Sequence, residues 1–203
     1  MMNNPNNQNN QMKLILASNS PRRREILTEF GYDFTVKTSD FKENDMQGDP
    51  VSVATRFAKG KALGVFLSEK RLDLSADIAV IGADTVVYFD GKILGKPKDK
   101  AEAYDTLKAL SGKKHSVVTG FAVISERLRV FGYDVSEVVF NDLSEKTVSE
   151  YVATGNPLDK AGSYGVQDGF DLVHEVRGSV YNVIGFPIEK IKFILDGFNN
   201  LDK

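Results

Sequence analysis

Strand-like and helix-like segments alternate along this 203-residue chain, and no other feature limits its fold so strongly. Apolar residues recur at helical spacing in several segments, and short runs with strand-like alternation separate them. Ser20 and Pro21 suit a helix start, and Gly31 suits its end. The interleaving, with hairpins mixed in, predicts an α/β protein with a mixed β-sheet and flanking helices. The expected helices cover residues 20–31, 51–67, 99–112, 144–153 and the segment from Pro187.

The longest apolar run, residues 77–94, predicts two strands with an interruption between them at Gly82–Thr85. An Asp-Gly pair near its end predicts a tight hairpin turn. Residues 161–178 are rich in glycine, and we expect them to be irregular. The other expected strands cover residues 13–17, 32–38, 115–125 and 130–142.

Composition and charge exclude several classes of protein. A formal net charge of −2 is not that of a nucleic-acid-binding polycation, so we expect no nucleic-acid partner. The absence of cysteine excludes disulfides and thiolate metal sites, and no apolar run approaches the ~20 residues that span a bilayer. The Asn-rich residues 1–12 do not resemble a signal peptide, so we expect a disordered tail, one domain over 13–203, and a cytoplasmic location. His115 and His174 are expected to be structural.

Three arginines, Arg22, Arg23 and Arg24, open the first expected helix, where the helix dipole disfavours cations. A phosphate ligand would compensate, because the free backbone N–H groups, the Ser20 hydroxyl and the guanidinium groups can all bind it. The alternative is a solvated basic helix start, which is what we expect for Arg24. For Arg22 and Arg23 the convergence of these groups favours a phosphate site.

Asp84 breaks an apolar run, and a buried carboxylate is costly unless it is paired or binds a metal. The alternative is an Asp-Thr bend between two strands. Glu43 is an ordinary surface acid unless it meets Asp84 around a hard cation such as Mg²⁺. Lys61 and Lys96 are candidate phosphate contacts, although most single lysines are simply solvated. Gln167 lies in a Gly-rich segment and could bind the edge of a nucleobase.

Seven blocks together with Glu43 resemble the Maf family of nucleoside triphosphate pyrophosphatases, in family order, from about residue 13 to 190. The resemblance implies an α/β fold with a nucleotide-binding cleft between two lobes. It also implies hydrolysis of a nucleoside triphosphate to the monophosphate and pyrophosphate, a divalent metal (Mg²⁺ or Mn²⁺), and often a homodimer. The blocks are "LASNSPRRREIL", "RFAKGKAL", "GADTVV", "LGKPKD", "LKALSGKKHSVVTG", "PLDKAGSYGVQ" and "NVIGFPI".

The resemblance also implies a role for each candidate residue. Asp84 matches the family's catalytic acid, which would orient or deprotonate water and hold the metal together with Glu43. Basic and hydroxyl side chains would grip the triphosphate, whose charge grows on the leaving pyrophosphate. The implied catalytic residues are Asp84 and Lys61, the substrate-binding residues are Ser20, Arg22, Arg23, Thr85, Lys96 and Gln167, and the metal ligands are Glu43 and Asp84.

Arg22, Thr85 and Gln167 match the branch of the family that acts on dTTP and UTP. The branch that acts on 7-methyl-GTP has Trp at the first of these positions, Gln at the second and no match at the third. Two residues depart from the family pattern, Asn156 and Asp168. Because Asp168 stands next to Gln167, the resemblance specifies the reaction more firmly than the base. The alternatives are therefore the same reaction on a modified purine nucleotide, or a cell-division regulator that acts by binding a partner without catalysis.

Overall fold

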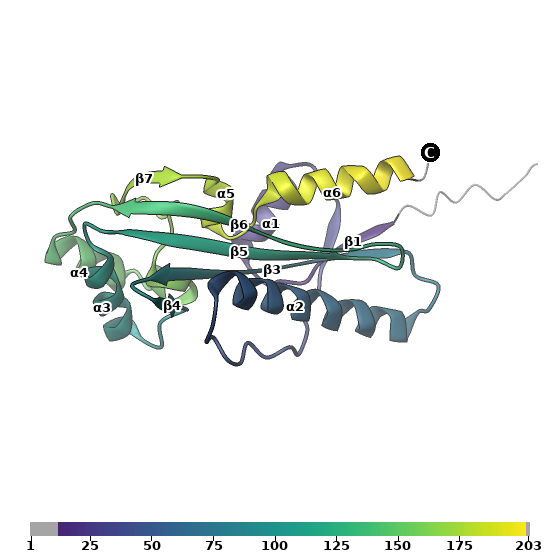
Figure 1. Ribbon diagram of the computed structural model, residues 1–203, viewed down its shortest axis with the longest axis horizontal. Coiled ribbons are helices and arrows are strands. Elements are labelled where there is room, and N and C mark those ends of the chain that lie inside the picture. The colour runs from purple at the N-terminus through teal and green to yellow at the C-terminus, as the bar shows by residue number, and fades with distance from the viewer. Residues whose placement is uncertain (1–11, 202–203) are drawn as a thin grey trace, which may run out of the picture.

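The structure is a computed structural model that describes residues 12–201, so all of the expected tail except Met12 lies outside the described residues. The strands are β1 (Lys13–Leu16), β2 (Phe34–Val36), β3 (Ile78–Phe89), β4 (Lys92–Leu94), β5 (Lys114–Ile124), β6 (Arg129–Phe140) and β7 (Val173–Arg177). Within the described range they form one seven-stranded sheet in the order β2-β1-β3-β5-β6-β7, with β4 beside β3 (Figure 1). β1 runs parallel to both of its neighbours and the other pairs are antiparallel, which confirms the predicted mixed sheet.

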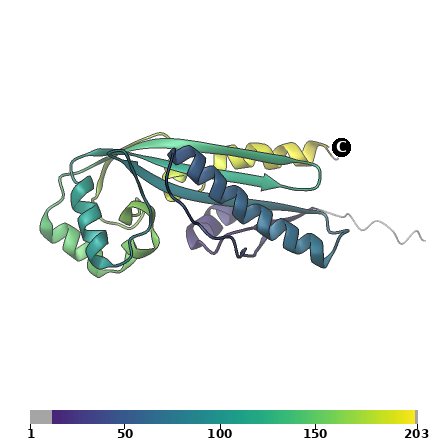
Figure 2. The same cartoon turned by 60° about the horizontal axis from the view of Figure 1, so that its bottom comes forward.

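Helices cover both faces of this sheet, as the α/β prediction requires. They are α1 (Pro21–Glu29), α2 (Pro50–Leu72), α3 (Lys100–Leu110), α4 (Glu145–Ala153), α5 (Val180–Ile184) and α6 (Ile188–Leu201), with short 3-10 turns η1 (Asn156–Asp159) and η2 (Ala161–Ser163). Figure 2 shows α2 along one face of the sheet and α6 on the opposite face. The alternation of β3 explains this, because Val80 packs among α2 side chains, whereas Ile81 packs among those of α1 and α6.

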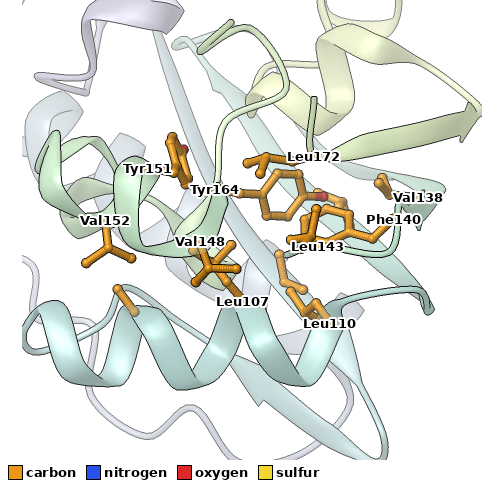
Figure 3. Packing of buried hydrophobic residues seen from close by; sticks show 13 residues of the cluster. Leu107, Leu110, Val138, Phe140, Leu143, Val148, Tyr151, Val152, Tyr164 and Leu172 are labelled. Atoms are coloured by element: carbon orange, nitrogen blue, oxygen red, sulfur yellow. The ribbon is translucent and has the colours of Figure 1, made fainter. Parts of the chain in front are cut away.

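A second, separate hydrophobic core lies at the end of the sheet next to α3 and α4, and it forms a second lobe (Figure 1). Figure 3 shows Leu107 of α3 and Val148 of α4 converging on Tyr164 and Phe140. The cores around α2, α1 and α6 share no residue with this cluster. Because β3, β5 and β6 run through both ends, the two lobes are joined by a continuous sheet (Figure 1).

The predicted interruption at Gly82–Thr85 is wrong, since β3 runs unbroken from Ile78 to Phe89. β5 pairs with it throughout the supposed gap. Gly82 is required there because a Cβ would collide with the backbone carbonyl of Ala58 in α2. On the side of β3 away from β5, β1 pairs with residues 78–81 and β4 pairs with residues 87–89. Residues 82–86 lie between these two partners, so this part of β3 has an edge without a neighbouring strand in the described part of the chain, which we call the open edge.

Two short elements differ from the sequence analysis. β7 lies within 161–178, which we expected to be irregular, and α5 precedes the helix expected from Pro187. β7 is an edge strand whose His174, Glu175 and Arg177 are all exposed, so it lacks the apolar alternation that identifies a strand. In contrast, α3 and α4 begin one residue after the predicted starts at 99 and 144, and the side chains of Asp99 and Ser144 cap them.

His115 lies in the second core, with its ring centroid 5.0 Å from that of Phe140 and 5.3 Å from that of Tyr164. A 2.7 Å hydrogen bond joins its Nε2 to the Tyr164 hydroxyl. Burial lowers the pKa of His115 from 6.5 to about 4, so the folded protein holds this imidazole neutral.

We expect His115 to make the folded protein less stable in acid. Below pH 6.5 the unfolded chain protonates His115 and the folded chain does not, so the free energy of unfolding falls as the pH drops towards 4. The fall in pKa corresponds to about 3 kcal/mol across that range. Urea unfolding at pH 7 and pH 4.5 should show a smaller loss for His115→Gln than for the wild type, whereas equal losses would contradict this origin.

Candidate active site

A cavity of about 610 Å³ lies at the open edge of β3, a size typical of small-molecule sites. One wall comes from the turn between β1 and α1, another from the loop 38–46, and the far wall from residues 159–167 of the second lobe. The structure therefore brings together residues from both lobes. All nine predicted site residues line this cavity: Ser20, Arg22, Arg23, Glu43, Lys61, Asp84, Thr85, Lys96 and Gln167.

Lys61 and the two predicted metal ligands form the centre of the cavity. The Lys61 ammonium lies 2.5 Å from Asp84 Oδ1 and 2.7 Å from Glu43 Oε1. Asp84 points from β3 toward α2, because it shares the strand face of Gly82, and Lys61 comes from α2 to meet it. The carboxylate in the apolar run is thus a paired group in a strand, not an Asp-Thr bend.

The loop that carries Glu43 approaches α2 closely because α2 has glycine at the contact. A Cβ on Gly60 would collide with the ring of Phe41, and one on Gly64 would lie 2.7 Å from Ser39 Cβ. The other end of the loop packs against Gly95, where a Cβ would lie 2.7 Å from the terminal methyl of Met46. Small residues on both sides therefore place Glu43 against the ammonium of the central lysine.

We expect Gly60→Ala to lower kcat/KM for nucleotide hydrolysis by about 10-fold, because displacing Phe41 moves Glu43 away from its position. The melting temperature should stay level or rise, since alanine favours a helix interior by up to about 1 kcal/mol over glycine. Gly197→Ala in α6, where a Cβ meets nothing within 4 Å, is the matched control. Unchanged activity in Gly60→Ala would show that Phe41 rotates aside without moving the loop.

Arg23 lines the cavity but is buried, and its guanidinium is bound by protein groups instead of being free to bind a phosphate. Its guanidinium donates to the Gly185 carbonyl (2.9 Å), the Ser18 hydroxyl (3.0 Å) and, at 3.5 Å, the Thr85 hydroxyl. Burial lowers the pKa of Arg23, and the nearby Asp84 charge opposes that effect. These contacts join the start of α1 to the turn between β1 and α1 and to the end of α5, so Arg23 helps to shape this wall of the cavity.

Arg22 lies nearer the open side of the cavity and bonds across it to the second lobe. Its guanidinium donates to Asp159 Oδ2 at 2.9 Å. Arg24 is exposed, as expected. Ser20 occupies the N-cap position of α1, but its side chain caps no backbone group, contrary to the sequence expectation. The first N–H groups of α1 therefore have no side-chain cap, and residues 20–23 line the cavity.

The two central carboxyl groups differ in their electrostatics. Burial raises the pKa of Asp84 above its ordinary value, even against the attraction of Lys61 and Arg23. Burial also opposes ionisation of Glu43, but the hydrogen bond and charge of Lys61 hold its pKa below the usual range. Asp84 is therefore the better proton acceptor of the pair, and Glu43 is the more firmly ionised carboxylate.

The donor set fits a hard divalent cation that is shared with a substrate. No cluster of three or more His, Cys, Asp or Glu side chains suited to a metal occurs among residues 12–201. Glu43 and Asp84 nevertheless converge on one cation, the Lys61 ammonium. Mg²⁺ commonly takes one or two protein carboxylates and completes its shell with waters and substrate phosphates, so these two side chains would suffice.

Thr85 and Gln167 occupy different walls. The Thr85 hydroxyl is 2.9 Å from that of Thr119, and Thr119 in turn donates to the Asn182 carbonyl. Gln167 is exposed, and within the described part of the chain its amide has no hydrogen-bond partner. Sequence reasoning missed Asp159 and Lys160, which also line the cavity, although both stand in the block "PLDKAGSYGVQ".

Comparison with known families identifies the family of the chain. Residues 13–198 match the family model described as "Maf-like protein", so the chain belongs to the Maf family.

Curated relatives cover nearly the full length of the chain. A protein of Aquifex aeolicus named dTTP/UTP pyrophosphatase is 44% identical over 94% of this chain and 97% of its own length. Proteins with the same name from Thermococcus gammatolerans and Clostridium acetobutylicum are 46% and 44% identical, over 88% and 92% of this chain and 92% and 98% of their own lengths.

Proposed function

We propose that this protein is a nucleoside triphosphate pyrophosphatase that hydrolyses dTTP and UTP to the monophosphate and pyrophosphate. The observation that carries the proposal is the cavity at the open edge of β3, where Lys61, Asp84 and Glu43 meet beside the basic start of α1. The relatives named dTTP/UTP pyrophosphatase support the choice of substrate.

In this mechanism water attacks the α-phosphorus and pyrophosphate leaves. Asp84, whose pKa is raised by burial, accepts the proton of the attacking water. Lys61 holds Asp84 in place and, together with Arg22 and Lys96, stabilises the negative charge that builds on the leaving group. A divalent cation, Mg²⁺ or Mn²⁺, held by Glu43 and Asp84 would supply further neutralisation of the phosphate charge.

Gln167 is the residue that we propose to read the base. A pyrimidine edge presents a carbonyl oxygen and a ring N–H, and an amide side chain can pair with both. Its free amide lies on the wall formed by the second lobe, opposite the phosphate-binding groups. A modified purine nucleotide such as 7-methyl-GTP, and a regulatory role without catalysis, are the alternatives that the assay below separates.

The test is hydrolysis of dTTP, UTP, CTP, dATP, GTP and 7-methyl-GTP with Mg²⁺ or Mn²⁺, with identification of the products. We expect dTTP and UTP to give monophosphate and pyrophosphate at the highest kcat/KM. A preference for 7-methyl-GTP would refute the base assignment and keep the reaction. Binding of nucleotide without turnover would favour the regulatory role.

The remaining assignments concern location and assembly. No helix within the described residues is long and apolar enough to cross a membrane. We propose that the protein works in the cytoplasm as a homodimer with no nucleic-acid partner. Sedimentation equilibrium at micromolar concentration tests the dimer, and a single species at the monomer mass would refute it.

A further inference from the structure

Asp168, one of the two departures from the family pattern, lies behind the wall that carries Gln167. Its side chain is only 9% exposed, which is unusual for an acid in a surface segment. The proposed mechanism gives it no role. A buried carboxylate beside a substrate cavity requires partners, and those partners define what it does.

Tyr151 is the first partner. This residue of α4 is fully buried, and its hydroxyl donates to Asp168 Oδ2 at 2.7 Å. The same hydroxyl accepts the backbone N–H of Gly165 at 2.9 Å. One oxygen atom on a rigid helix therefore holds both ends of the segment 165–168, and Gln167 stands between them.

Lys160 is the second partner. Its ammonium lies 3.3 Å from Asp168 Oδ2 and 2.8 Å from Asp159 Oδ1, and it donates to the Asn156 carbonyl at 2.6 Å. Because Lys160 is 8% exposed, these contacts are screened little by solvent. Both side chains pack closely against Gly165, because a Cβ there would lie 2.7 Å from Asp168 Oδ1 and 2.7 Å from Lys160 Cε.

The network continues to the phosphate side of the cavity, since Asp159 also binds Arg22 at 2.9 Å. Asp168 thus completes a chain of alternating charges that runs from the wall bearing Gln167 to the basic start of α1. Removing its charge leaves Asp159 as the one carboxylate paired with Lys160 among these contacts and weakens the hold on one end of the segment 165–168.

We infer that Asp168 is a positioning residue for base recognition: through Tyr151 and Lys160 it fixes the segment 165–168 and so aims the Gln167 amide at the nucleobase. This inference rests on the proposed function and deepens it. Because Asp168 acts through Gln167, its loss weakens binding of the pyrimidine and its discrimination from purines, and leaves the chemical step intact.

The test is a double-mutant cycle of Asp168→Asn and Gln167→Ala, with Asp171→Asn as the control. Asp171 belongs to the same stretch and binds Asn141 outside the cavity. We expect Asp168→Asn to raise KM for UTP about 5-fold, to change kcat less than 2-fold, and to lower the preference for UTP over GTP by a similar factor. In the Gln167→Ala background, Asp168→Asn should add less than 2-fold.

An additive cycle, or an unchanged KM, would overturn the inference, because a merely structural role would act equally in both backgrounds. Tyr151→Phe provides a second route, since it removes the shared hydroxyl and keeps the ring, and it should reproduce the rise in KM. Calorimetric binding of α,β-methylene-UTP accompanies the kinetics. If the wild type binds this analogue but hydrolyses no nucleotide, the proposed function fails, and the same cycle in Kd decides whether Asp168 positions Gln167. If the wild type neither hydrolyses nucleotides nor binds α,β-methylene-UTP, the proposed function and the inference about Asp168 are both wrong.

Discussion

Asp84→Asn is expected to lower kcat for dTTP and UTP by about 100-fold or more while the protein remains folded. The substitution removes the proton acceptor with the raised pKa and one of the two carboxylates that would hold the metal. Lys61 keeps Glu43 as a partner at 2.7 Å, so no unpaired charge remains in the cavity. Steady-state kinetics with saturating Mg²⁺, together with a thermal melt, measure both effects.

The control for this variant is Asp134→Asn. Asp134 binds Lys190 at 2.7 Å on β6, outside the cavity, and so repeats the carboxylate–lysine contact without the proposed chemistry. We expect its kcat to stay within 2-fold of the wild type. If Asp84→Asn kept a tenth or more of the activity, Asp84 would not be the general base.

Lys61→Met should have the second largest effect. Without the shared ammonium, Glu43 and Asp84 face each other with like charges, and the attraction that lowers the pKa of each is lost. We expect kcat/KM to fall about 100-fold at pH 7, and the acid limb of its pH profile to move to higher pH because both carboxyl groups then hold protons more tightly.

Lys59→Met is the matched control, because Lys59 lies on the same helix and contacts the ring of Phe131 at 4.9 Å. Its profile between pH 5 and 9 should overlay that of the wild type. Lys61→Arg keeps the charge and should recover part of the activity. An unshifted acid limb in Lys61→Met would mean that the lysine does not control the ionisation of the two carboxyl groups.

Local signals predicted much of this fold. The starts of α3 and α4 are predicted to within one residue, and Asp99 and Ser144 cap these helices through contacts only three residues long. The pair of long strands β5 and β6 follows from alternation and a short turn. β7 was not predicted, because an exposed edge strand has no buried face and its sequence therefore shows no apolar alternation.

The site was predictable as a set of residues and not as a geometry. An acid in an apolar run and arginines at a helix start are local conflicts, and such conflicts mark Asp84, Arg22 and Arg23 without reference to the rest of the chain. The partners are a tertiary property: Arg23 binds the carbonyl of Gly185, 162 residues away, and no local pattern specifies that contact. The same holds for the meeting of Glu43 and Asp84 on one lysine.

In the proposed mechanism, this cavity directs water onto the α-phosphorus of a pyrimidine nucleoside triphosphate. Hydrolysis of UTP in ¹⁸O-labelled water with Mg²⁺, followed by mass spectrometry of the products, tests it most directly. The mechanism predicts one ¹⁸O atom in UMP and none in pyrophosphate, with no label transferred by Asp84→Asn. Label in pyrophosphate, or release of UDP and phosphate, would place the attack at another phosphorus and contradict this mechanism.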